Sequence, residues 1–450
     1  MALLHAVLGF YLALAGPPSR AQTINTSPDQ SQPAPQPVSI TLEEAVHRAQ
    51  VNEPSYATAV ADSRSAALDR SIARSALLPG VTYHNQYLYT QGTGLATPSS
   101  QGSSTAVPRF IANNAVHEYM SQGVVDETIG VAEIAGVRHA DAAAAMAAAE
   151  LEISRRGLVA AVNGLFYSVL ADDHKLAIAQ QARAEADDFV ALTGKREQQR
   201  EAAHADVVKA QLQQQQRERE LSDARLAAEK SRLELGVLLF PDPRTPYMLT
   251  APENPQLASR TDVEQAAGKN NPELRSALAA VAQSNADVLA ARGAYLPSLG
   301  LNYTYGIDSA QFAIYDPAHV RNLGYSASAT LDIPVWDWLA MQHKVKQSEI
   351  RRDAAKVSLT NAQRRLIARL DEAYSEAVAA GDQLASLDAS VKTAEESLRL
   401  TKMRYTGGEA TVLEVVDAQT AFVAAENARE DGRIRYQAAL ADLQTLTGTM

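Results

Sequence analysis

The stretch that decides the fold is residues 323–335, which read Leu-Gly-Tyr-Ser-Ala-Ser-Ala-Thr-Leu-Asp-Ile-Pro-Val. Apolar side chains occupy every second position, and Gly, Ser, Thr, Asp or Pro lies between them. Residues 299–308 follow the same rule, with Leu, Tyr and Ile at the odd positions. Such alternation predicts β-strands with two unlike faces. A tyrosine-rich apolar face opposite a face of small polar residues is typical of a strand with lipid outside and water inside.

Four strands are predicted in all, at about residues 81–90, 110–125, 299–308 and 322–335. In the first of them the odd positions are apolar or aromatic, except for Asn85. The second strand has no clean alternation, so the sequence does not assign its lipid face.

One unit of about 200 residues occurs twice in the chain, which makes it a domain-sized repeat rather than a short solenoid period. Residues 73–79 (Ala-Arg-Ser-Ala-Leu-Leu-Pro) return as 291–297 (Ala-Arg-Gly-Ala-Tyr-Leu-Pro). Residues 207–211 (Val-Val-Lys-Ala-Gln) return as 415–419 (Val-Val-Asp-Ala-Gln). Each copy is predicted to contain a helix, a strand pair, a long helix and another helix.

The boundaries follow from this repeat and from local composition. We predict a first structural repeat over 40–245, an inter-repeat linker over 246–260 and a second repeat over 261–450. Residues 2–15 are apolar except for His5, and small residues then lead to Ala21, which predicts a signal peptide over 1–21. Residues 22–39 are rich in Pro, Gln and Ser and are predicted to form a flexible tether.

The helical part is predicted to consist of long antiparallel hairpins. Residues 128–194 and 338–405 contain no proline, and a helix of that length extends about 100 Å. Apolar or small residues recur every three or four positions across 366–398, which is typical of a coiled-coil seam. Short polar breaks at 198–200 and 406–408 precede the partner helices, which must therefore run antiparallel.

Composition excludes several functions. The net charge of -11 disfavours nucleic acid as a partner, because phosphate binding needs a basic face. The chain has no cysteine, and its nine histidines are scattered without a His-x-x-x-His pair. No nucleotide-binding or nucleophile motif occurs. We therefore predict no enzyme, no cofactor and no metal site.

The strands raise the question of how their edges are paired. Four strands cannot close a barrel, and open edges are not tolerated in hydrocarbon, so the barrel must be shared between chains. Eight, twelve or sixteen strands would need two, three or four copies. The alternative is a periplasmic coiled-coil or adaptor protein that never enters a membrane. The duplicated strand pairs with an apolar tyrosine face favour the membrane protein.

Residues 402–419 (Lys-Met-Arg-Tyr-Thr-Gly-Gly-Glu-Ala-Thr-Val-Leu-Glu-Val-Val-Asp-Ala-Gln) carry a family resemblance. Together with the Leu-Pro pairs before two of the strands and residues 333–337 (Ile-Pro-Val-Trp-Asp), they resemble the TolC family of outer-membrane efflux and secretion channels over about residues 40–448. The resemblance implies a mainly α fold, in which a homotrimer builds a twelve-stranded β-barrel in outer-membrane lipid and a long α-helical barrel in the periplasm.

The same resemblance implies a passive export duct of a tripartite efflux or type I secretion system. Its cargo would be small molecules, metal ions or polypeptides, and its partners a periplasmic adaptor protein and an inner-membrane pump. Glu414 and Asp417 match the acidic pair that lines the tunnel entrance, and Tyr405 and Asp206 match a pair that holds the tips closed. The alternatives are a solvated acidic face for the two acids and a coiled-coil seam position for Tyr405. Where some relatives carry a further arginine tie this chain has Ala410, so we expect that tie to be missing.

Two more sets of residues complete the predicted sites. Arg200, Gly407 and Gly408 lie at the positions of the tip surface that meets the adaptor in the family, but only Gly408 is retained, so the resemblance implies a different adaptor specificity. Trp336 and Trp338 follow the fourth strand, where aromatic side chains anchor at the lipid headgroup level. We predict that they form part of an interface belt.

Overall fold

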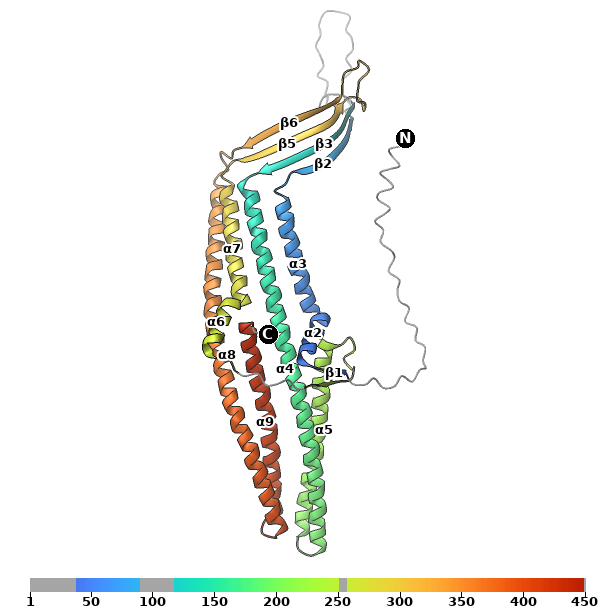
Figure 1. Cartoon of the computed structure of the whole chain (residues 1–450), viewed down its shortest axis with the longest axis vertical. Coiled ribbons are helices and arrows are strands. Elements are labelled where there is room, and N and C mark those ends of the chain that lie inside the picture. Colours follow the sequence, from blue (N-terminus) through green and yellow to red (C-terminus); the bar gives the residue numbers. More distant parts are fainter. Residues whose placement is uncertain (1–37, 90–116, 251–256, 449–450) are drawn as a thin grey trace, which may run out of the picture.

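The computed structural model describes residues 38–89, 117–250 and 257–448. Two long helical hairpins carry a β-sheet at one end (Figure 1). The elements are β1 (Val38–Ile40), α2 (Leu42–Asn52), α3 (Pro54–Ser75), β2 (Gly80–Tyr89), β3 (His117–Ile129), α4 (Val131–Gln198), α5 (His204–Leu239), β4 (Tyr247–Leu249), α6 (Arg260–Asn270), α7 (Pro272–Gly293), β5 (Ser298–Ser309), β6 (Leu323–Asp332), α8 (Ala340–Thr406) and α9 (Val412–Thr447).

The helices of the second repeat have almost the same lengths as those of the first. The paired helices α2 and α6 have 11 residues each, α3 and α7 have 22, α5 and α9 have 36, and α4 and α8 have 68 and 67. A proline opens the second helix of each copy, Pro54 in α3 and Pro272 in α7. Proline suits the first helical turn, where no backbone N–H is needed, and it turns the preceding residue away from helical geometry. The sequence repeat is thus a repeat of elements.

The sheet joins the two repeats. Its order is β2-β3-β5-β6 with every pair antiparallel, so the central β3–β5 pair links the first copy to the second. β2 and β6 form the two edges, and neither has a partner on its outer side within the described residues. Edges of this kind present unpaired backbone groups to a neighbouring chain.

The strands differ from their predicted bounds mainly in β3. It extends to Ile129 rather than residue 125, because its ladder with β5 continues as far as the pair Ile129 and Leu299. Residues 90 and 110–116 lie outside the described residues. β6 ends at Asp332 and not at 335, since Pro334 has no N–H for the ladder.

The predicted tether and linker each contain a short strand. β1 begins at Val38 inside the tether, and β4 lies inside the linker, where the two pair in parallel with Val38 opposite Tyr247. Helix α6 also begins at Arg260, the last residue of the predicted linker. Strands of three residues have no periodic pattern, so the sequence did not predict them. The predicted signal peptide lies outside the described residues.

The apolar core is divided along the hairpins. One cluster of buried side chains surrounds Phe166, where α2, α4 and α5 meet, and another surrounds Leu370 between α6, α8 and α9. A third, around Val415, lies at the tips. Small residues bring α8 and α9 close together, since a Cβ added to Gly432 would lie 2.5 Å from Leu387 Cδ1.

None of the described helices has both the length and the hydropathy to cross a membrane.

Candidate functional site

The strand register gives the sheet one largely apolar face that continues across all four strands. Residues directly opposite one another in an antiparallel ladder point to the same side, so the register carries one face across all four strands. Tyr83 lies opposite Gly123, Gly123 opposite Tyr305, and Tyr305 opposite Tyr325. We call this the odd face. It holds, in β2 and β3, Val81, Tyr83, Asn85, Tyr87, Tyr89, His117, Tyr119, Ser121, Gly123, Val125, Glu127 and Ile129, and in β5 and β6, Leu299, Leu301, Tyr303, Tyr305, Ile307, Ser309, Leu323, Tyr325, Ala327, Ala329 and Leu331.

The interruption at Asn85 is compensated on the neighbouring strand. Asn85 lies opposite Ser121, whose hydroxyl donates a 2.8 Å hydrogen bond to Asn85 Oδ1. The Tyr83 hydroxyl lies 2.7 Å from the same Ser121 oxygen. Two polar residues on an apolar face thereby satisfy each other, which lowers the cost of removing them from water.

The opposite, even face is polar. It carries Thr, Asn, Gln, Ser and Gly over much of its area, including Gln122, Asn302, Thr304 and Ser328. Thr304 and Ser326 lie opposite each other, with hydroxyl oxygens 2.9 Å apart. The sheet therefore separates an apolar surface from a hydrated one.

The two tryptophans lie where β6 passes into α8. Trp336 and Trp338 are 69% and 85% exposed, and their rings meet edge to face at 5.9 Å. Trp338 and Leu339 both have left-handed backbone conformations, which turn the chain sharply at this point. The carboxylate of Asp337 accepts a hydrogen bond from the Met341 N–H and so caps the start of α8. An exposed indole pair is thus held at the end of the strands.

Both hairpins turn tightly at the opposite end of the molecule (Figure 1). In the first tip Arg200 takes a left-handed conformation with φ 60°, and its N–H donates to Glu197 O at 2.9 Å. In the second tip Gly408 has φ 81°, a conformation that glycine adopts at little cost. Gly407 precedes it as the C-cap of α8. The three predicted adaptor-contact residues therefore lie in the two turns.

The predicted acidic pair lies on the first turns of α9. Glu414 and Asp417 are both exposed, whereas Val412 and Val415 are buried against the tip core. Glu414 is also the third residue of a capping box. Its carboxylate accepts from Thr411 N at 3.3 Å, while Thr411 Oγ1 accepts from Glu414 N at 3.3 Å. The Thr-x-x-Glu spacing was visible in the sequence but was not used.

Glu414 also forms an ion pair with Arg404, whose guanidinium lies 3.6 Å from the Glu414 carboxylate. No ion pair neutralises Asp417 within the described part of the chain. Within the described residues, Glu414 is therefore held by its capping box and by Arg404, whereas Asp417 has no ion pair.

Tyr405 occupies a seam position. It is 4% exposed and packs against Phe189 of α4 at 5.3 Å between ring centroids. Its hydroxyl lies 3.4 Å from Thr193 Oγ1, and no hydrogen bond joins it to Asp206 among the described residues. Thr193, one helix turn beyond Phe189, is thus the described hydrogen-bond partner of Tyr405, and the pairing of Tyr405 with Asp206 stays a prediction.

Arg196 connects the two tips, and the sequence analysis missed it. Its guanidinium donates to Tyr405 O, and it lies over the Tyr405 ring at 4.8 Å from the centroid. Glu201 faces the same guanidinium as an ion pair at 3.5 Å. The side chain of Arg196 is 16% exposed. No motif marks this arginine, since its partner lies in the other repeat.

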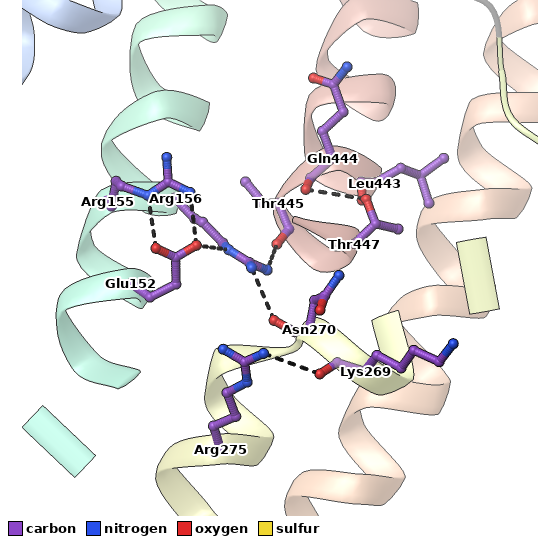
Figure 2. Close-up of polar contacts among 10 residues, drawn as sticks. All are labelled: Glu152, Arg155, Arg156, Lys269, Asn270, Arg275, Leu443, Gln444, Thr445 and Thr447. Atoms are coloured by element: carbon purple, nitrogen blue, oxygen red, sulfur yellow. Dashed lines mark hydrogen bonds and ion pairs between the residues drawn. The ribbon is translucent and has the colours of Figure 1, made fainter. Parts of the chain in front are cut away.

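A second arginine joins the repeats midway along the molecule (Figure 2). Arg156 is 6% exposed and donates to Thr445 O at 2.9 Å and to Asn270 O at 3.0 Å. These carbonyls end α9 and α6, so one cation meets the negative ends of two helix dipoles. A Cβ added to Gly448, which has φ 72°, would lie 2.3 Å from Arg156 Nη2. The C-terminal turn of α9 therefore needs glycine there.

Glu152 holds this arginine in place. Its carboxylate accepts two hydrogen bonds from Arg155, at 2.8 and 2.9 Å, and one from Arg156 at 2.7 Å. The hydrogen bonds from Arg155, and then the one from Arg156, lower the pKa of Glu152 from its usual 4.5 to about 2, although partial burial opposes the shift. Among the described residues, no group of three His, Asp or Glu side chains is arranged to hold a metal ion.

Known proteins resemble this chain in sequence and in fold. Residues 263–449 match the family described as outer membrane efflux protein. The chain is 29% identical over 180 residues to outer membrane protein OprJ of Pseudomonas aeruginosa, covering 39% of this chain and 36% of OprJ. It is 26% identical over 195 residues to the proteases secretion protein PrtF of Dickeya chrysanthemi, covering 42% of each. The alignments thus span about two fifths of these relatives.

The fold likeness extends further along the chain. This chain superposes on the structure of the CmeC outer membrane channel of Campylobacter jejuni with a TM-score of 0.75 and 16% sequence identity. The superposition covers 90% of this chain and 85% of CmeC. This likeness covers both repeats, and it confirms the predicted mainly α fold with attached strands.

Proposed function

We propose, from the premise that residues 263–449 belong to the outer membrane efflux protein family, that the whole chain is an outer-membrane channel-tunnel. It serves as a passive export duct that extends into the periplasm. The main support is the sheet, whose odd face is apolar and rich in tyrosine while its even face is polar. Such a sheet fits lipid on one side and a water-filled lumen on the other. The family and the fold are those of channel proteins.

Three copies close the barrel in this proposal. The β2 edge of one copy pairs with the β6 edge of the next, and the alternating strand directions keep that pair antiparallel. The edge helices support such packing, because large apolar side chains are exposed on both. Leu68 and Ile72 on α3 and Ile350 and Val357 on α8 are examples. The homotrimer then has twelve strands.

The cargo and partners belong to the same proposal, and the names of the relatives support it. OprJ is an outer membrane protein and PrtF a proteases secretion protein, so efflux of small molecules or metal ions and secretion of polypeptides are all compatible with the family. An inner-membrane pump supplies energy, and a periplasmic adaptor docks at the tips through Arg200, Gly407 and Gly408. Trp336 and Trp338 anchor the barrel at the periplasmic headgroup level.

The tips form the tunnel entrance. Asp417, with Glu414 one helical turn before it, makes acidic rings about the three-fold axis. Tyr405 and Arg196 hold the second hairpin against the first and so set how far these carboxylates reach toward the axis. Asp206 lies in the first turn of α5, where a negative charge stabilises the helix start.

Reconstitution tests the function. We expect the purified mature chain to require detergent, to run as a trimer and to form pores in planar lipid bilayers. A protein that stays monomeric and dissolved without any amphiphile would instead support the periplasmic coiled-coil or adaptor function.

The acidic entrance gives the first prediction. Replacing Glu414 with Gln and Asp417 with Asn should lower the K⁺ over Cl⁻ permeability ratio several-fold, because the rings no longer concentrate cations. The reversal potential across a KCl gradient measures the ratio. Glutamine still completes the capping box, so the helix start is preserved.

Glu409→Gln is the matched control for this change. Glu409 is exposed in the same tip and makes no described side-chain ion pair, and it lies before the start of α9. An unchanged permeability ratio in the double variant would remove the entrance assignment.

A further inference from the structure

The even face of the sheet is acidic as well as polar. Asp126, Asp308, Asp332 and Glu118 all lie on it by register. The four strands contain no lysine or arginine, and His84 is the one histidine on this face. The first three carboxylates are exposed.

These charges are not neutralised within the described residues. The ion pairs there all lie outside the four strands, and none involves the three aspartates or Glu118. Glu118 adds an independent observation. It is 3% exposed, and its Oε2 has no hydrogen-bond partner in the described structure. A buried carboxylate oxygen without a hydrogen-bond partner is costly, and a cationic group close to it lowers that cost.

The register separates the acids into two levels. Asp126 lies opposite Asn302 and Asp332 opposite Ser298, at the end of the sheet that meets the helices. Asp308 lies opposite Met120 at the far end, and Glu118 is two residues along the same strand from Met120. A charged particle that moves along this face therefore passes both levels.

We propose that the barrel lumen is a second cation-selecting element, separate from the entrance at the tips, and that it favours small cations and cationic organic molecules over anions. This inference rests on the proposed function, since the even face must line a lumen. Three copies place all four acids three times around it. A twelve-stranded barrel has a backbone radius of roughly 12 Å. That radius is comparable to the screening length of about 10 Å at 0.1 M salt, and far larger than the value of about 3 Å at 1 M.

The experiment compares the reversal potentials of wild-type and variant trimers of the mature chain in KCl gradients. The lumen variant is Asp126→Asn, Asp308→Asn and Asp332→Asn, which leaves the buried Glu118 intact. A negative lumen potential of about kT/e changes the ratio of cation to anion concentration in the lumen about sevenfold. We expect the K⁺ over Cl⁻ ratio to fall several-fold near 0.1 M KCl, to fall further when the entrance acids are also neutralised, and to change little at 1 M.

Glu127→Gln is the matched control. It removes one acid from β3, the strand that carries Asp126, but from the odd face. If the triple variant does not assemble, Asp308→Asn replaces it and is compared with Asp308→Glu, which keeps the charge. Pores of normal conductance with an unchanged ratio at 0.1 M would overturn this inference and leave the proposed function standing. Failure of the wild-type chain to form any pore would overturn both.

Discussion

Replacing Arg196 with alanine is expected to raise the single-channel conductance of the reconstituted trimer several-fold. The change removes the cation over the Tyr405 ring and the hydrogen bond to Tyr405 O, which together join the first tip to the second. The second hairpin is then free to move away from the axis and widen the entrance. Single-channel recording in planar bilayers measures the effect.

The size of this effect follows from three-fold symmetry. A cation–π contact contributes about 0.5–2 kcal/mol and a hydrogen bond from a charged group about 1.5–3 kcal/mol. A loss of at least about 2 kcal/mol per copy amounts to about 6 kcal/mol for the trimer. Moving a two-state equilibrium from 1:99 to 99:1 takes about 5.5 kcal/mol, so the variant should be mostly open.

Lys195→Ala is the control for charge. Lys195 is the exposed neighbour of Arg196, and no described side-chain contact depends on it. It should leave the conductance unchanged. Arg196→Lys keeps the cation but loses the planar fork and should give an intermediate conductance. If Arg196→Ala and Lys195→Ala behave alike, Arg196 does not hold the tips together.

Replacing Arg156 with alanine is expected to cost about 3–5 kcal/mol of folding free energy, the usual result of removing one partner from a buried ionic network. The carbonyls of Thr445 and Asn270 would lose their shared donor, and α6 and α9 would lose the cation at their negative ends. We expect a lower midpoint for urea unfolding, followed by circular dichroism, and less trimer on native gels.

Arg155→Ala is the control for this cluster, because Arg155 bonds Glu152 but touches neither carbonyl. It should cost clearly less than Arg156→Ala. Equal losses would show that the helix ends do not depend on Arg156.

The stability that the Glu152 cluster contributes depends on pH. The pKa of Glu152 is lowered in the folded chain, from 4.5 to about 2, so its stabilisation is present above pH 4.5 and is lost as the pH falls toward 2. The side chain of Glu152 is 28% exposed, so solvent screens part of this interaction and the stabilisation is smaller than the pKa shift alone implies. The stability difference between wild type and Glu152→Gln should therefore shrink between pH 5 and pH 2.

The tips show which predictions local sequence could support. The seam interpretation of Tyr405 agrees with its burial against Phe189, because a three-four spacing of apolar residues is a local property of a helix. The role of Glu414 in a capping box was also readable from Thr411 three residues earlier. Arg196 was not, because its partner Tyr405 lies 209 positions away.

By itself the sequence determined the duplicated order of elements, the long hairpins and the two-faced strands. Those features depend on periodicities of two or 3.6 residues within one segment. The tertiary structure alone decided which side chains of β3 join the odd face, since that strand has no clean alternation and takes its orientation from the register with β2 and β5. It also decided that Arg156 binds Thr445, a residue 289 positions away. Contacts of that range arise only when the two repeats pack together, and no local pattern encodes them.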